Sequence, residues 1–89
     1  MTNPTHYAVA LRYRKEENAA PVVLARGVDR VALAIRARAG RADIPVIENR
    51  PLARALYARA KVGAAIPADL YGPVARVLAA VYKNRRRRS

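Results

Sequence analysis

The chain of 89 residues contains no cysteine, no tryptophan and no phenylalanine. Without cysteine it can form no disulfide, no thiolate metal site and no cysteine nucleophile. It has one histidine and six acidic residues, which are scattered along the sequence. A metal site needs three or four clustered ligands, so this composition argues against one. We therefore expect neither a metal nor another cofactor.

Long apolar runs are also missing. No run approaches the ~20 residues of a transmembrane helix. The first residues, MTNPTH, lack the basic and apolar regions of a signal peptide. A chain of this length forms one small domain and leaves no room for a second. Apolar residue types make up 53% of the chain, which is enough to pack a core and argues against wholesale disorder.

The chain is strongly basic, with 18 basic and six acidic residues and a net charge of +12. This charge makes a nucleic-acid-binding protein one alternative, supported by the run RRRR at residues 85–88. Against it, the arginines are spread over all expected elements, and the tyrosines lie mostly in apolar stripes, so no base-stacking platform stands out. A tail attracted to anionic lipid is a further option.

Apolar periodicity predicts the element order β-β-α-β-α-α. Alternation over residues 6–14 is typical of a strand, and the apolar run 22–25 predicts a second strand, covered on both faces and ended by Gly27. A third strand is expected over residues 44–48. Because helices between strands favour crossover connections, we expect a single compact α/β domain, a small mixed β-sheet with helices packed on it.

Three helical stripes accompany these strands. The first runs over residues 28–39 and is expected to end at Gly40; the second runs over residues 51–60, before Gly63. The third covers residues 66–81, where Pro73 leaves two alternatives, a helix that begins near Gly72 or one kinked after its first turn. Residues 84–89 are expected to form a basic, flexible tail.

The residues that carry chemistry are Asn3, Pro4, Thr5 and His6, directly before the first strand. Pro4 has no N–H, so it cannot attack the Asn3 side chain as the next residue does in deamidation. The Asn3 side-chain nitrogen can instead attack its own backbone carbonyl, form a succinimide and expel the Pro4 nitrogen. A turn that holds the amide near this carbonyl would assist the reaction.

His6 could exchange protons with the attacking amide or the leaving nitrogen, because imidazole does so near neutral pH. The alternative interpretation is an ordinary turn, since Asn-Pro followed by polar residues is a common turn sequence, with His6 as a turn or core residue.

Beyond this motif, the sequence resembles the self-cleaving cytoplasmic domain of the FlhB/YscU/HrcU (SpaS/EscU) family, the export-apparatus switch proteins of flagellar and virulence type III secretion. Arg26 stands where the family usually has lysine. Four ordered blocks carry the likeness: NPTHYAVALRY at residues 3–13, APVVLARG at 20–27, PLARALY at 51–57 and GAAIPADLYGPVARVLA at 63–79.

The resemblance implies one self-cleavage between Asn3 and Pro4, with Thr5 and His6 as the assisting turn, rather than a turnover enzyme. It implies control of the switch in export substrate specificity in a flagellar system, with a virulence injectisome homologue as the alternative. Implied partners are the membrane-embedded N-terminal part of the same protein, export gate components, secreted substrates and a length-control protein. The implied location is the cytoplasmic face of the bacterial inner membrane.

The resemblance also divides the chain into the cleavage turn (residues 1–6), an export-switch domain (7–83) and the tail (84–89). Ala20, Pro21, Ala75 and Leu78 match apolar positions that the family uses to dock early export substrates, although Ala75 and Leu78 equally fit a helix core. Since the membrane part is missing, we expect a fragment whose Met1 replaces upstream sequence. We expect cleavage in it to be slow.

Overall fold

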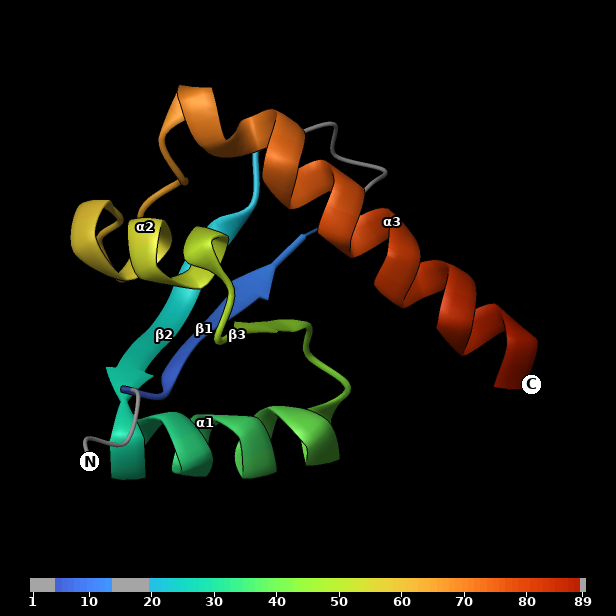
Figure 1. The fold of residues 1–89 in the computed structure, drawn as a ribbon. Coiled ribbons are helices and arrows are strands. Elements are labelled where there is room, and N and C mark those ends of the chain that lie inside the picture. The colour runs from blue at the N-terminus through green and yellow to red at the C-terminus, as the bar shows by residue number, and fades with distance from the viewer. Residues whose placement is uncertain (1–4, 14–19, 89) are drawn as a thin grey trace.

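The computed structural model describes residues 5–13 and 20–88, with residues 82–88 described by their backbone alone. The predicted class and element order are confirmed: helices pack on a small sheet in a single α/β domain (Figure 1). The elements are the strands β1 (Tyr7–Arg12), β2 (Val22–Val28) and β3 (Val46–Glu48), the helices α1 (Asp29–Ala42), α2 (Pro51–Arg59) and α3 (Tyr71–Arg88), and a 3₁₀ turn at Ala68–Leu70.

The sheet has the order β2-β1-β3, with the first strand in the centre. Both ladders are antiparallel, which differs in this detail from the mixed sheet that the sequence predicted. The expected crossover is present: β2 and β3 run parallel to each other on either side of β1, and α1 connects them across the central strand. Consequently the ends of both outer strands lie beside the beginning of β1.

Strand β2 is longer than expected and differs at two residues. Gly27 does not end the strand but pairs with Ala8 inside it. The register shifts between Ala10 and Leu11, which leaves Leu24 in a β-bulge at the sheet edge, 39% exposed. The expectation that this run is covered on both faces was therefore wrong at Leu24, because β2 is an edge strand.

The two faces of the sheet are covered by different helices, α2 and α3 on one side and α1 on the other (Figure 1). One face packs against α2 and α3 through a cluster of large aliphatic residues, which includes Leu11, Ile47 and Leu56. The opposite face meets α1 through small residues, among them Ala8 of the sheet and Ala32 of the helix, both fully buried. Burial on both faces explains why β1 is apolar at consecutive positions.

Two helix ends differ from the prediction, and a third was left open. Helix α1 passes through Gly40 and ends at Ala42. Asp43 caps it with a left-handed backbone (φ 59°) and donates its N–H to the Ala39 carbonyl oxygen. Pro73 lies in the first turn of α3, where a helix has no partner for an N–H, so the helix begins before it. Helix α3 continues to Arg88, over most of the predicted tail, whose flexibility stays a prediction.

Candidate functional site

The motif before β1 is described from Thr5 onward. Thr5 is exposed and His6 is half-buried, and both lead directly into Tyr7, the first residue of the strand. Asn3 and Pro4, the predicted nucleophile and leaving residue, lie outside the described residues. The described part of the motif is therefore the segment that directly follows the predicted cleavage point.

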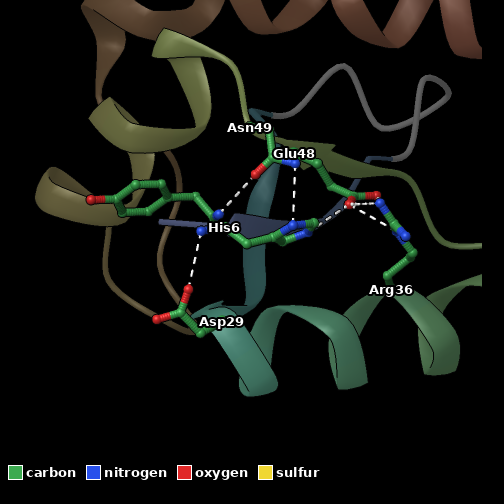
Figure 2. A network of polar contacts seen from close by, with 6 residues as sticks. His6, Asp29, Arg36, Glu48 and Asn49 are labelled. Atoms are coloured by element: carbon green, nitrogen blue, oxygen red, sulfur yellow. Dashed lines mark hydrogen bonds and ion pairs between the residues drawn. The ribbon is translucent and has the colours of Figure 1, made fainter. Parts of the chain in front are cut away.

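Two residues that follow the outer strands hold the backbone of this segment. After β2, Asp29 donates its N–H to the His6 carbonyl oxygen at 2.7 Å, and its Oδ1 accepts the His6 N–H at 3.1 Å. After β3, Asn49 donates its N–H to the Tyr7 carbonyl oxygen at 3.1 Å, and its Oδ1 accepts the Tyr7 N–H at 3.0 Å. We call Asp29 and Asn49 the clamp, because each closes two hydrogen bonds on one residue. Figure 2 shows the side-chain bond of each pair.

Both clamp residues have a left-handed backbone, with φ of 51° at Asp29 and 52° at Asn49. Aspartate and asparagine tolerate this conformation better than most residues, because their short polar side chains can hydrogen-bond locally. The clamp thus uses the residue types that both the backbone and the side-chain bonds require. Replacing either by alanine would remove the side-chain bond and strain the backbone.

The His6 ring is held at both nitrogens. Its Nε2 lies 3.1 Å from Glu48 Oε2, and its Nδ1 lies 3.2 Å from Asn49 Nδ2 (Figure 2). An amide nitrogen only donates and an ionised carboxylate only accepts. The contacts therefore fit a neutral imidazole whose proton is on Nε2, where it is donated to Glu48, and whose Nδ1 accepts from Asn49.

Glu48 joins His6 to Arg36 on α1. The Arg36 Nε lies 2.8 Å from Glu48 Oε2 and 3.1 Å from Oε1. Burial raises the pKa of the Glu48 carboxyl, whose side chain is 23% exposed, but hydrogen bonds and charge from Arg36 and His6 outweigh this effect and hold the pKa below its ordinary value. The hydrogen bond and charge of Glu48 in turn raise the Arg36 pKa. Glu48 therefore stays ionised and can keep accepting the His6 proton.

An open pocket of about 440 Å³ lies beside the clamp, lined by Thr5, His6, Tyr7, Asn49 and Arg54. The guanidinium carbon of Arg54 lies 5.6 Å from the centre of the Tyr7 ring, within the range of a cation–π contact. The pocket thus has a cationic and aromatic wall on the α2 side, next to the motif.

A second cation–aromatic contact lies next to Tyr7. The Tyr7 ring meets the Tyr57 ring edge-to-face at 5.5 Å, and Arg26 of β2 lies 5.1 Å from the Tyr57 ring centre. Arg26 also donates a hydrogen bond to the Tyr57 carbonyl oxygen. These contacts tie α2 to the beginning of β1.

The four predicted docking residues fall into different environments. Ala75 is exposed on α3, whereas Leu78 of the same helix is 2% exposed and belongs to the aliphatic core. Pro21 is buried and Ala20 is half-buried, just before β2. In this conformation a partner could therefore reach Ala75 directly but not Leu78, and the docking role stays a prediction.

Four site residues were not singled out from the sequence: Asp29, Arg36, Glu48 and Asn49. The sequence did contain a signal at Asn49, which directly follows the third expected strand, where asparagine favours turns. Asp29 carried no such signal, because it lies within the first expected helical stripe. The sequence contained no signal that both turns meet the same strand, since their side-chain bonds to the motif segment join residues 23 and 42 positions apart.

The described part of the chain offers neither a metal site nor a membrane-spanning helix. In residues 5–13 and 20–88, no group of three or more histidine or acidic side chains is arranged to hold a metal ion. None of the helices described combines the length and hydropathy that crossing a bilayer requires.

Comparison with known proteins decides the family. The model of the FlhB HrpN YscU SpaS family matches residues 1–81. This chain belongs to that family. The resemblance drawn from the four sequence blocks is thereby confirmed.

Members of the FlhB/YscU family with curated descriptions are similar over nearly the whole chain. The flagellar biosynthetic protein FlhB of Yersinia enterocolitica is 54% identical over 97% of this chain and 22% of its own length. The hypersensitivity response secretion protein HrcU of Ralstonia nicotianae is 49% identical over 89% of the chain and 22% of its own length. The chain therefore spans about a fifth of the length of these relatives.

The fold also matches a solved structure of the FlhB/YscU family. The crystal structure of the cytoplasmic domain of FlhB from Shewanella putrefaciens is 47% identical to this chain, with a TM-score of 0.74. The match covers 86% of this chain and 64% of that one. At this identity and TM-score, the likeness supports a shared fold.

Proposed function

We propose that this chain is the self-cleaving switch domain of a flagellar type III export apparatus. The carrying observation is the clamp, which fixes the backbone of His6 and Tyr7 immediately after the expected cleavage point. Family membership supports the same function, because members take part in flagellar biosynthesis and in secretion.

The proposed reaction is a cyclisation of Asn3 that occurs once in each molecule. The Asn3 side-chain nitrogen bonds to the Asn3 carbonyl carbon, and the bond from that carbon to the Pro4 nitrogen breaks. The attacking amide loses one proton and the Pro4 nitrogen gains one, so no net proton is consumed. Water then opens the succinimide. Such an intramolecular attack depends on orientation, which a rigid segment downstream improves.

His6 and Thr5 support the turn in this proposal. Both ring nitrogens of His6 have partners, so in this conformation the ring anchors the segment instead of presenting a free base. If Asn49 moved aside, Nδ1 would be the nitrogen able to take a proton, since Glu48 holds Nε2–H. Replacing His6 by alanine should therefore slow cleavage and not abolish it.

The partners and the location follow from the same proposal. The domain would lie at the cytoplasmic face of the inner membrane, joined to a membrane-embedded part and in contact with export gate components. Export substrates and a length-control protein would bind it, with Ala20, Pro21, Ala75 and Leu78 as the expected docking positions. Of these, Ala75 has the exposure that direct contact requires.

A homologue from a virulence injectisome is the second candidate, because HrcU of Ralstonia nicotianae, at 49% identity, is as similar as several flagellar relatives, which range from 42% to 54%. The 54% identity to a flagellar protein favours the flagellar system. Nucleic-acid binding is not favoured, since family membership explains the four sequence blocks without it.

The experiment is an Asn3→Ala substitution in the longer protein that carries this domain. The variant lacks the attacking amide, so it should remain uncut and export early substrates without switching to late ones. Cleavage is read by mass spectrometry and export by the secreted proteins. An Asn3→Ala protein that is still cut at the same bond, or that switches normally, would exclude the proposed function.

A further inference from the structure

Asn49 contacts both the backbone and the ring of the segment that follows the cleavage point. Its Oδ1 accepts the Tyr7 N–H at 3.0 Å, and its Nδ2 lies 3.2 Å from His6 Nδ1. The Tyr7 N–H can only donate, which determines the end of the Asn49 amide that carries the oxygen. The NH₂ group must then face His6. The hydrogen bond that it donates can be accepted only by a ring nitrogen that carries no proton.

We propose that Asn49 is a positioning residue for the self-cleavage: it holds the start of β1 in place and keeps His6 in its neutral, Nε2-protonated form. This inference rests on the proposed function. Its physical basis is that a clamp on residues 6 and 7 leaves only Thr5 between the fixed strand and Pro4. Fewer free backbone bonds beside the scissile bond mean a narrower set of turn conformations.

The other charged groups around the His6 ring keep the same contacts whether the ring carries one proton or two. Glu48 of β3 accepts the Nε2–H in both states, and Asp29 at the start of α1 accepts the backbone N–H in both. Arg36 of α1 lies behind Glu48, and Arg54 of α2 lines the same pocket. A second ring proton, on Nδ1, would point at the NH₂ group of Asn49 and break that bond.

The sharpest test is Asn49→Asp, which is almost isosteric. A carboxylate can still accept the Tyr7 N–H, and aspartate tolerates the left-handed backbone. Its second oxygen, however, accepts where the NH₂ group donated, so it favours the doubly protonated ring. Cleavage of the 89-residue chain is followed by intact mass between pH 5.5 and 8. The rate of Asn49→Asp relative to wild type should fall as the pH falls, because the variant's ring keeps its second proton over more of this range, and a ratio that does not change with pH would overturn the proposal.

Removing the contacts altogether should slow cleavage at every pH. Asn49→Gly keeps the left-handed backbone but loses both side-chain bonds, and Asn49→Ala strains the backbone as well. We expect the cleavage rate to fall about 10-fold for Asn49→Gly and about 100-fold for Asn49→Ala, relative to wild type. The matched control is Asp43→Ala, which replaces a residue with similar φ (59°) at the far end of α1 and should cut at the wild-type rate. If Asn49→Gly is folded and cuts as fast as this control, the proposal is wrong.

A readout that does not involve cleavage tests the ring directly. In the ¹⁵N spectrum of the wild-type chain at pH 8, His6 should carry its proton on Nε2. Asn49→Asp should keep both ring protons at a pH where the wild type has lost one. A wild-type ring protonated on Nδ1 would overturn the inference and leave the proposed function standing. A wild-type chain that never cuts would overturn the proposed function, and this inference with it.

Discussion

The two faces of the sheet are built from residues of different size. Toward α2 and α3, the sheet presents large aliphatic side chains such as Leu11 and Ile47, which pack with Leu56 in one continuous cluster. Toward α1, it presents alanine and glycine. A Cβ atom added to Gly27 would lie 2.2 Å from Val31 Cγ1, so the helix approaches as closely as a glycine allows.

Because of this difference, one face of the sheet supplies most of the stability and the other determines where the site residues lie. Burial of large apolar side chains supplies most of the free energy of folding, so the α2 and α3 face carries most of the stability. The α1 face buries less, but its close approach brings Asp29 and Arg36 to the beginning of β1. Small residues on this face therefore determine the geometry of the clamp and of the Glu48 network.

Truncation on the aliphatic face should have the largest effect on stability. Leu56 is fully buried in the core cluster, so Leu56→Ala should lower the free energy of unfolding by about 2–5 kcal/mol. Urea unfolding of both proteins measures this difference. A loss below about 1 kcal/mol would mean that this face does not carry the stability assigned to it.

Enlargement on the α1 face should have a smaller but still unfavourable effect. Gly27→Ala forces Val31 or the helix to move and should cost about 1–3 kcal/mol. The matched control is Gly40→Ala within α1, where an added Cβ meets no atom within 4 Å and should raise stability by about 0.5–1 kcal/mol. Equal effects of the two substitutions would contradict the close approach of α1.

Acid should weaken the α1 side through Glu48. Because the folded-state pKa of Glu48 lies below its ordinary value, its contribution is full above about pH 5 and is lost as the pH falls through the folded pKa. Glu48→Gln should therefore be less stable than wild type at pH 7, by up to about 1 kcal/mol, and the two should converge toward pH 2. Unfolding experiments at several pH values measure this.

The free energy of unfolding of the Glu48→Gln protein should still depend on pH. The hydrogen bond from Arg59 also lowers the pKa of Asp69, so this exposed ion pair loses stability in acid in both proteins. A difference between wild type and variant that is constant from pH 7 to pH 2 would show that Glu48 contributes nothing through its charge.

Periodicity predicted the elements well because it reports burial directly. The consecutive apolar residues of β1 and the stripe containing Val74 and Leu78 are buried as expected. The glycines were interpreted less well. Gly27 and Gly40 were expected to end elements, whereas both lie inside them, since the close approach of α1 at Gly27 is a tertiary property that local sequence does not contain.

The site could be predicted only in part, for the same reason. The motif that precedes β1 was recognisable because its chemistry is local to four consecutive residues. The clamp depends on the strand order β2-β1-β3, which brings Asp29 and Asn49 to one place. Likewise, the α3 stripe could not separate exposed Ala75 from buried Leu78, because both lie on or beside it.

The central claim is that this chain cuts itself between Asn3 and Pro4 by attack of the Asn3 amide. It is tested most directly by intact-mass measurement of the purified 89-residue chain and its Asn3→Ala variant, incubated side by side at neutral pH. The account predicts slow conversion of the wild type to a species that begins at Pro4, and an unchanged variant. Cleavage of the variant at the same bond, or a wild type that remains whole, would contradict it.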